Sequence, residues 1–399
     1  MILRKAFKFR LREKHPCEYG VFHRFAGCCR FVWNKALALQ IEQLNKGKRC
    51  LSYPEMAEML VQWKKKHPFL KEAPSQALQQ RLMDLDRAIK DAFDPKSPKE
   101  FPQFKKKYKS LPSFRYPQGF DISGSRIFLP KFGWARFFKS RKITGTAKNV
   151  TVSLSGKHWY VSIQTEQTVE EPVHGSSLSV GIDFGVKRLL TLSDGTYYMP
   201  LNAYKNAMGK LAIAQRKLSR MVKRSSNWIK QKRTIEKLHI RIADARRNYL
   251  HVISSEVSKN HAVIVLEDLQ VKNMTASAQG TEDKRGKNVR QKAGLNRAIL
   301  DQGWGELKRQ IEYKQKWRGG LTIFVDPAYT SQECSACGHV SPENRPSQEL
   351  FYCEKCGYTA NADENAAKVV KSRAGHARVV CGSNGAAMPS EAETNRVIA

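Results

Sequence analysis

Two CxxC pairs near the end of the chain constrain its fold more than any other sequence feature. They are separated by 15 residues, and their cysteines are Cys334, Cys337, Cys353 and Cys356. This spacing lies within the range of four-cysteine zinc sites. Because four thiolates fill the coordination shell of Zn²⁺, we expect one structural ion that shapes an inserted finger and takes no part in catalysis.

Three acidic residues stand at the ends of predicted core elements. Asp183 follows a strand in GIDFG, Glu267 ends a buried strand in VLED, and Asp363 opens a helix in NADENAA after a possible cap at Asn361. Each acid alone has a simpler explanation, as a turn, strand-end or helix-start residue. Their order is more specific. A strand ending in Asp is followed by two more strands, a strand ending in Glu and a late helix opening with Asp. This order predicts a ribonuclease H-like nuclease core.

The chemistry of such a core explains the need for several carboxylates. Two divalent ions about 4 Å apart clamp the attacking water and the leaving oxygen of a phosphodiester. Mg²⁺ prefers carboxylate oxygens and water as ligands, and cations relieve the repulsion between neighbouring carboxylates. We therefore expect Asp183, Asp363 and one acid of the central strand to bind Mg²⁺. Alternation along VIVL leaves open whether that acid is Glu267 or Asp268.

The charge of the chain indicates a polyanionic partner. Among 399 residues, Lys and Arg number 70 and Asp and Glu 36, which gives a formal net charge of +34 and a pI near 9.9. A hydrophobic content of 41% with 10% aromatic residues is typical of a globular protein. A positive surplus spread along the whole chain favours nucleic acid as the partner.

The sequence also predicts an intracellular location. No apolar run approaches the roughly 18 residues that a membrane span needs, and the basic N-terminus lacks a signal core. Five further cysteines show no disulfide framework and suit a reducing interior: Cys17, Cys28, Cys29, Cys50 and Cys381. Disulfides between the CxxC pairs are disfavoured for the same reason.

The first half of the chain predicts a small antiparallel β-barrel with a helical insert. Residues 1–10 and several short strands in 111–166 form the barrel, and residues 11–110 form the insert. Apolar spacing predicts helices in the insert at 19–47, 54–66 and 74–93. Basic and aromatic residues alternate around Arg115, a mixture suited to phosphates and bases but also to a half-buried barrel face.

A polar linker, 167–177, precedes the second half. Three consecutive strands are expected from residue 178, then a helical hairpin over 204–249 with 14 Lys/Arg and two acids. Outside its apolar stripes the hairpin is almost wholly cationic, including Lys223 and Arg224 near its turn. A solvated face normally mixes charges of both signs, so a nucleic-acid track is favoured. Further expectations are strands at 261–269 and 321–326, a mobile segment at 270–296, a helix at 296–317 and a disordered tail at 373–399.

Several motifs together resemble one known family over residues 1–372. The motifs are GIDFGVK, VLEDL, LNRAILDQGWGELKRQIEYKQKWRGG, DPAYTSQECSACG, CEKCGYTANADENAA and the early RFVWNKALALQ. They are similar to TnpB, the transposon-encoded OrfB protein related to type V CRISPR effector nucleases. The resemblance implies an α+β multidomain fold. A wedge barrel (1–10 and 111–166) with a helical recognition insert (11–110) precedes a RuvC-like nuclease (178–327 and 358–372) that contains the zinc finger (328–357).

The same resemblance implies an RNA-guided endonuclease that cuts double-stranded DNA beside a short adjacent motif and supports transposon maintenance. The RuvC acids are then Asp183, Glu267 and Asp363, with two Mg²⁺ (or Mn²⁺), and the cysteines hold one Zn²⁺. The partners are a guide RNA from the transposon end, target DNA and, functionally only, a companion transposase. The location is the prokaryotic cytoplasm, at the nucleoid when DNA is bound. By position, the adjacent motif is read by Tyr53, Gln76, Gln80 and Ser123.

Three other classes of protein share some of these features. A DNA-strand transposase would join ends as well as cut. Some such enzymes bind a metal through a paired-histidine site, and this sequence contains no close HxH pair. An actin-like ATPase or sugar kinase also has Asp-x-Gly after a strand, but needs a second glycine-rich loop. A non-catalytic RNA-guided repressor would lack an active-site acid. All three acids are present.

Overall fold

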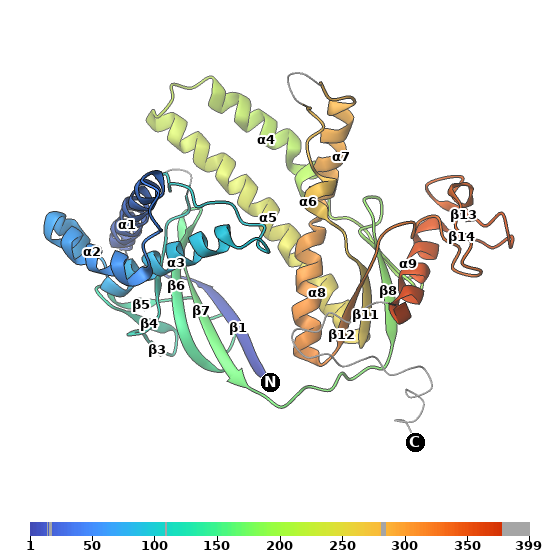
Figure 1. The fold of residues 1–399 in the computed structure, drawn as a ribbon, viewed down its shortest axis with the longest axis horizontal. Coiled ribbons are helices and arrows are strands. Elements are labelled where there is room, and N and C mark those ends of the chain that lie inside the picture. Colours follow the sequence, from blue (N-terminus) through green and yellow to red (C-terminus); the bar gives the residue numbers. More distant parts are fainter. Residues whose placement is uncertain (14, 16–17, 108–109, 281–284, 377–399) are drawn as a thin grey trace. The chain divides into compact units, whose positions relative to one another are not determined.

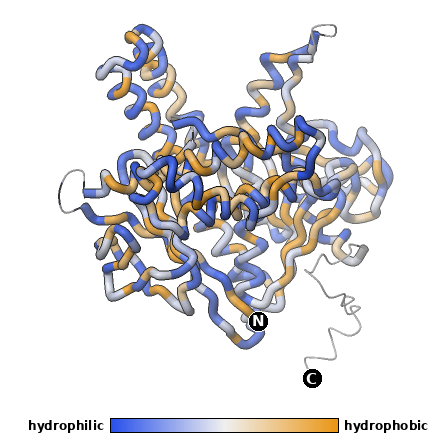
Figure 2. The backbone as a smooth tube through the Cα atoms, turned by 60° about the vertical axis from the view of Figure 1, so that its left-hand side comes forward, coloured by the Kyte–Doolittle hydropathy of each residue, from blue (hydrophilic) through white to orange (hydrophobic). Residues whose placement is uncertain are grey.

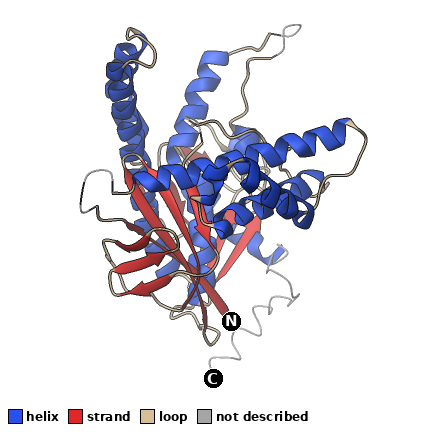
Figure 3. Cartoon of the chain, turned by 90° about the vertical axis from the view of Figure 1, so that its left-hand side faces the viewer, coloured by secondary structure: helices blue, strands red, loops and turns tan. Residues whose placement is uncertain are grey.

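A computed structural model describes residues 1–13, 15, 18–107, 110–280 and 285–376. The chain divides into two compact units, Met1–Glu170 and Glu171–Ala399, with the boundary inside the segment 167–177. Each unit combines helices and strands (Figure 3), which confirms the α+β fold class. Cys17, Cys381 and all but the first four residues of the tail 373–399 lie outside the described residues.

The first unit is built on a four-stranded antiparallel sheet in the order β1-β7-β6-β2. Its strands are β1 Ile2–Arg10, β2 Ser113–Tyr116, β6 Thr146–Ser155 and β7 His158–Thr168. Along β1, Phe7 and Phe9 point into the core while Lys8 and Arg10 are exposed, as expected for a strand with one buried face. The N-terminal strand therefore joins the later strands, as predicted.

A second, three-stranded sheet holds β3 Asp121–Ser123, β4 Arg126–Leu129 and β5 Gly133–Arg136. One isolated bridge, between Leu11 and Phe137, links the end of β1 to the chain after β5. In the described part of the chain, β1 and β2 remain the outer strands of the larger sheet. The strands thus form two open sheets, and the closed barrel expected from the sequence is not seen.

Three helices separate β1 from β2, and the sequence located them to within two residues. They are α1 Gly20–Asn45, α2 Tyr53–Lys66 and α3 Ser75–Phe93, with a short 3₁₀ turn, η1, at Pro68–Lys71. Aromatic rings join α1 to the sheet: Phe22 lies 5.4 Å from Trp159 and Phe25 lies 5.6 Å from Phe114, measured between ring centroids. Helices and sheet therefore share one core.

The second unit contains a five-stranded sheet in the order β10-β9-β8-β11-β12 (Figure 1). The strands are β8 Ser179–Phe184, β9 Leu190–Leu192, β10 Tyr197–Tyr198, β11 Val263–Glu267 and β12 Leu321–Val325. β8, β11 and β12 are parallel, whereas β9 and β10 continue antiparallel from β8. The three consecutive strands and the two later strands agree with the sequence prediction.

Helices cover both faces of this sheet (Figure 1). On one face, Ile264 and Leu266 of β11 pack with residues of α5 Ser226–Asn260 and α8 Trp304–Arg318. On the opposite face, Val265 packs with Val370 of α9 Ala362–Ser372. Since successive side chains of a strand point to opposite faces, each residue of β11 is assigned to the α8 side or the α9 side.

The basic hairpin consists of α4 Ala203–Ser219 and α5, and α5 continues beyond the predicted end at residue 249. The first turn of α4 is capped from a distance by Asp301, whose carboxylate accepts hydrogen bonds from the backbone N–H groups of Tyr204 and Lys205. A carboxylate at a helix N-terminus satisfies free N–H groups and complements the helix dipole.

Two predictions between residues 270 and 317 were wrong. The segment expected to be mobile contains α6 Val271–Met274 and the beginning of α7 Val289–Gln302. The single helix predicted at 296–317 is two helices, α7 and α8, because Gly303 between them has φ +72°. This left-handed conformation suits glycine and ends a helix.

Apolar segments in the described chain are short. Hydrophobic and hydrophilic stretches alternate along the backbone (Figure 2), and none of the described helices combines the length and apolar character of a membrane span.

Candidate active site

The three predicted acids meet on the α9 face of the second unit's sheet. On β8, Val180 and Ile182 belong to the core on the α8 side, so Asp183 points to the α9 side. On β11, Glu267 shares its face with Val265, which packs against α9. β8 and β11 are parallel, and Leu266 pairs with Ile182. The next residues along the two strands, Glu267 and Asp183, therefore lie side by side.

Helix α9 brings the third acid to the same face. Asn361 caps the helix, since its side chain accepts hydrogen bonds from the backbone N–H groups of Asp363 and Glu364. The close approach of α9 depends on Gly181 of β8. A Cβ at this position would lie 2.6 Å from the backbone nitrogen of Lys371 and collide with the carbonyl oxygen of Ala367.

The carboxylates of this acid cluster (Asp183, Glu267 and Asp363) affect one another's ionisation. Burial, together with the charges of Glu267 and Asp363, raises the pKa of Asp183 from 3.8 to about 8. Burial also raises the pKa of Glu267, whose side chain is 5% exposed. The Thr330 hydroxyl donates a hydrogen bond of 2.6 Å to Glu267 Oε1 and opposes that increase. Burial and mutual repulsion therefore disfavour the ionised form of the cluster.

Two basic residues act on the cluster, and neither was predicted from the sequence. One of them, Arg373, lowers the pKa of Glu267. Arg345, from the segment between the CxxC pairs, lies 3.5 Å from Asp363 Oδ1 and lowers the pKa of Asp183. Its distance from the acids in sequence hides the contact. The alternative acid of β11, Asp268, points to the other face, where its carboxylate accepts a 2.6 Å hydrogen bond from Lys308 of α8.

The acids fit a hard divalent cation by chemistry, but they are not packed as tightly as the cysteines. In the described chain, the four cysteines are the group of His, Cys, Asp or Glu ligands whose atoms all lie within 4.8 Å of one another, and the acid cluster does not meet this criterion. Carboxylate oxygens are nevertheless the ligands that Mg²⁺ prefers. The raised pKa of Asp183 is the structural sign that a cation would stabilise the ionised site.

The four cysteine sulfurs form a compact cluster that fits Zn²⁺. Sγ of Cys334 lies 3.7 Å from that of Cys356, and Cys337 and Cys353 are 3.6 Å apart. Sulfurs about 2.3 Å from a tetrahedral zinc ion are separated by about 3.8 Å. Disulfide bonds are much shorter, at about 2.05 Å. The distances therefore favour metal over disulfides.

Each CxxC pair adopts the same turn. Gly338 and Gly357 follow the pairs, both have φ +72°, and their N–H groups donate 2.8 Å hydrogen bonds to the carbonyls of Cys334 and Cys353. Only glycine adopts this left-handed conformation at little cost. The sequence pattern of two cysteines followed by glycine thus corresponds to a repeated local structure.

Two buried asparagines fix the finger. Asn365 of α9 accepts from the Ser335 N–H and donates to the Glu333 carbonyl, so the first CxxC turn is tied to the helix that carries Asp363. Asn344, in the 3₁₀ turn η2 Pro342–Asn344, bonds to both CxxC regions. Strands β13 Leu350–Tyr352 and β14 Thr359–Asn361 complete the finger, and η3 Arg373–His376 follows α9.

The residues predicted to read the adjacent motif lie in the first unit. Tyr53 begins α2 and is partly buried, Gln76 and Gln80 lie on α3, and Ser123 is exposed on β3. Gln80 donates a hydrogen bond to Asp84, and Arg115 of β2 lies 3.7 Å from the same carboxylate. Gln80 and Arg115 thus both lie beside the carboxylate of Asp84.

The predicted basic residues of the hairpin lie at its exposed turn. Lys223 and Arg224 are both exposed between α4 and α5, and Arg224 adopts a left-handed conformation with φ +72°. Ser225 then caps α5 by accepting a hydrogen bond from the Trp228 N–H. Both cations are accessible to a ligand.

Comparison with protein families covers most of the chain in three parts. Residues 162–278 match the IS605 OrfB family described as "Probable transposase", and residues 304–370 match a Cas12f1-like TNB domain. Residues 1–49 match a helix-turn-helix domain of the OrfB family, although here they form β1 and α1.

Full-length relatives and a solved structure agree with these matches. The chain is 54% identical to "Putative RNA-guided DNA endonuclease InsQ" of Escherichia coli K12, over 95% of this chain and 94% of that protein. It is 32% identical to a "Putative RNA-guided DNA endonuclease" of Streptomyces pristinaespiralis, over 95% and 91%. A Cas12f1 chain, solved by cryo-EM with sgRNA and target DNA, has the same fold, with TM-score 0.53 and 14% identity over 93% of this chain and 99% of that one. The chain therefore belongs to the IS605 OrfB family of TnpB proteins that its motifs resemble.

Proposed function

We propose that this protein is a transposon-encoded RNA-guided DNA endonuclease. A guide RNA pairs with one strand of double-stranded DNA, the protein reads a short motif beside the target, and the acid cluster hydrolyses the phosphodiester bonds. The observation that carries this proposal is the convergence of Asp183, Glu267 and Asp363 from β8, β11 and α9 on one face of the sheet. The names of the full-length relatives support it.

In the proposed site, Asp183, Glu267 and Asp363 would hold two Mg²⁺ or Mn²⁺ ions. When bound, such ions lower the pKa of a coordinated water and stabilise charge on the phosphate oxygens. Thr330 holds the Glu267 carboxyl through its 2.6 Å hydrogen bond. Arg345 provides positive charge next to Asp363 and is placed to contact an anionic phosphate. The N-cap of α9 fixes the backbone that presents Asp363.

The four cysteines would hold one Zn²⁺ with a structural role. Because they supply a complete set of four ligands, no position remains for a substrate. The finger would then support Arg345 and, through Asn365, the helix of Asp363.

The remaining assignments follow from family membership. Residues 1–10 and 111–166 would form the wedge domain, 11–110 the recognition insert, 178–327 with 358–372 the RuvC-like nuclease, and 328–357 the finger. Tyr53, Gln76, Gln80 and Ser123 would contact the adjacent motif, while Arg115, Lys223 and Arg224 contact nucleic-acid backbone. The protein would act on DNA in the prokaryotic cytoplasm, alongside a companion transposase that it does not bind stably.

The experiment that tests the proposed function begins with expression of the protein together with its native locus. RNA that co-purifies with the protein is sequenced, and a plasmid library with a target matching the RNA end and randomised flanking bases is then incubated with the complex and Mg²⁺. We expect one discrete RNA and cleavage of plasmids that share a short flanking motif. A protein that carries no discrete RNA and cuts no library member would contradict the proposal.

A DNA-strand transposase is the second candidate, because the matching family description for residues 162–278 is "Probable transposase". Such an enzyme joins the strands that it cuts. Sequencing of reaction products for transposon ends joined to target DNA separates the two functions, and we expect cut ends without joined products.

A further inference from the structure

A cationic cavity of about 190 Å³ lies in the first unit, and its lining includes none of the residues assigned to the adjacent motif. Three basic side chains line it from different elements: Arg30 from α1, Arg81 from α3 and Lys105 from the loop before β2. Ser110 and Ser113 add polar groups to the wall. The volume far exceeds the roughly 10–15 Å³ that one water molecule requires, so a small anion fits.

Arg81 is held rigidly at the wall of this cavity. Its guanidinium donates hydrogen bonds of 2.6 and 2.9 Å to the carbonyl and hydroxyl oxygens of Ser113, and its side chain is 16% exposed. Asp84 is the acid beside it, at 3.3 Å, and Asp84 also lies 3.7 Å from Arg115. One carboxylate therefore serves two guanidinium groups, and the charge of the cavity stays positive.

Lys105 is fixed through its backbone. Its N–H donates a 2.8 Å hydrogen bond to the side chain of Asn34, and its carbonyl accepts a 3.0 Å bond from the same side chain. The ammonium group lies 3.4 Å from the centre of the Trp33 ring. Burial and the nearby Arg81 lower the pKa of Lys105 to about 8. The fold thus holds two cations close together at a cost in electrostatic repulsion.

Arg30 is the cation that the cavity leaves without a protein partner. It is partly buried, and among the described residues no hydrogen bond or ion pair involves its guanidinium. A guanidinium offers five N–H donors in a planar arrangement that matches phosphate oxygens. Its position beside two fixed cations points to an anion as the missing partner.

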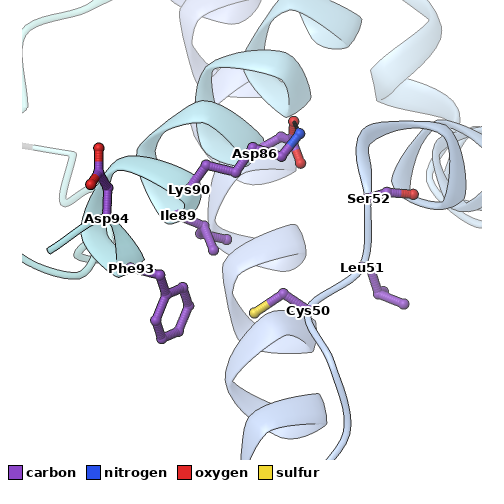
Figure 4. Close-up of a pocket in the computed structure, with 8 residues that line it drawn as sticks. All are labelled: Cys50, Leu51, Ser52, Asp86, Ile89, Lys90, Phe93 and Asp94. Atoms are coloured by element: carbon purple, nitrogen blue, oxygen red, sulfur yellow. Dashed lines mark hydrogen bonds and ion pairs between the residues drawn. The ribbon is translucent and has the colours of Figure 1, made fainter.

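A larger cavity in this unit has a different character. That cavity, of about 370 Å³, contains Leu51, Ile89 and Phe93 together with Lys90 (Figure 4). Its Lys90 is neutralised by a 2.8 Å hydrogen bond to Asp86. The smaller cavity has three cations and lacks an acid of its own among its described lining residues.

We propose that Arg30, Arg81 and Lys105 form a binding site for a phosphate group of a nucleic-acid strand. Charge-assisted hydrogen bonds from arginine and lysine are strong and geometrically suited to phosphate. A bound phosphate relieves the repulsion between the cations and supplies Arg30 with a partner. The inference rests on the proposed function in that the strand is the guide RNA or the target DNA.

The test compares Arg30→Gln with Arg87→Gln in the full-length protein. Arg87 is an exposed arginine of α3 outside the cavity and provides the control for loss of one positive charge. Binding of a labelled 20-nucleotide RNA and of a 20-base-pair DNA is measured without added Mg²⁺ at several salt concentrations. One lost phosphate contact lowers the salt slope by about 0.7 for single strands and about 0.9 for duplex DNA.

We expect Arg30→Gln, but not Arg87→Gln, to weaken binding several-fold and to reduce the salt slope by this amount, with unchanged thermal stability. If Arg30→Gln lowers the salt slope for RNA, the bound strand is the guide RNA, and if it lowers the slope for DNA, the bound strand is the target DNA. Equal slopes for both variants would overturn the site while leaving RNA-guided function intact. Failure of the wild-type protein to bind either nucleic acid would overturn both proposals.

A second measurement separates a strand from a free anion. Inorganic phosphate is titrated into wild-type protein and Lys105→Gln while the melting temperature is recorded. In phosphate-free buffer we expect Lys105→Gln to melt at or above the wild-type temperature, because it removes a repelled charge. A phosphate-dependent increase in the melting temperature with no effect of Arg30→Gln on nucleic-acid binding would show a free-anion site and contradict the proposal.

Discussion

The guanidinium of Arg345 lies 3.5 Å from the carboxylate of Asp363, joining the zinc finger to the first turn of α9. The finger therefore contributes more than support, since it places a cation that faces the acid cluster. We expect Arg345→Ala to slow DNA cleavage by about 100-fold, the usual scale for one lost charge-stabilising donor, with zinc content unchanged. Arg345→Lys should recover part of the rate. Lys355→Ala, an exposed finger variant, is the control, and equal rates for the two alanine variants would show that Arg345 is dispensable.

Stability without metal depends on the ionisation of Asp183. Because the pKa of this group rises from 3.8 in the unfolded chain to about 8 in the folded protein, the folded state binds the extra proton between these values. The free energy of unfolding in Mg²⁺-free buffer without a chelator therefore falls as pH rises from about 4 to about 8. Asp183→Asn cannot ionise, so its melting temperature should exceed that of the wild type at pH 8.5 and approach it at pH 5. Mg²⁺ should narrow the gap at pH 8.5. If the difference in melting temperature between Asp183→Asn and the wild type did not change with pH, the raised pKa of Asp183 would be contradicted.

Gly181 sets the distance between β8 and α9. The Cβ of Gly181→Ala meets the backbone of Ala367 and Lys371, which cannot move as a side chain can. We expect a loss of about 1–3 kcal/mol in unfolding free energy and a large loss of cleavage, because Asp363 moves with α9. Gly209→Ala in α4 meets nothing within 4 Å and should be neutral or stabilising. Denaturant unfolding measures both variants, and equal stability would refute the close approach.

Zinc should be present at one ion per chain and should act through structure. Replacing the buried Cys353 with serine is expected to abolish zinc binding, lower the melting temperature and reduce cleavage, and added Mg²⁺ should not restore activity. Cys50→Ser, outside the cluster, should leave the zinc content unchanged. Elemental analysis and thermal melting provide the readouts. Full zinc content in Cys353→Ser would show that the four cysteines are not the ligands.

The sequence predicted the position of the acids well because each is marked by its place at the end of a strand or helix. The alternation along this strand did not distinguish Glu267 from Asp268, because it gives two faces without saying which helix covers each, and only the family resemblance chose Glu267. In the structure, Val265 contacts α9, which places Glu267 on the same side of the sheet. Asp268 faces Lys308 of α8 instead.

The features that the sequence missed depend on contacts between distant segments. Arg345 lies in no motif, and Asn365 lies in NADENAA without a sign of its role there. Both roles follow from how the finger folds back on α9. The prediction of a closed barrel was wrong for a related reason. Strand patterns specify which residues face a core, whereas closure requires pairing between β1 and β2, which lie at opposite edges of the sheet. The break at Gly303 was not predicted, because one glycine within a helical pattern does not by itself show that the backbone adopts positive φ there.

The most direct test of the account is cleavage by Asp183→Ala. The guide RNA complexes of the wild type, Asp183→Ala and Asp268→Ala are incubated with a matched plasmid and Mg²⁺, and the RNA bound to each protein is quantified. The account predicts no detectable cleavage by Asp183→Ala with normal RNA binding, and cleavage near the wild-type rate by Asp268→Ala. Cleavage by Asp183→Ala at the wild-type rate would contradict the placement of the active site.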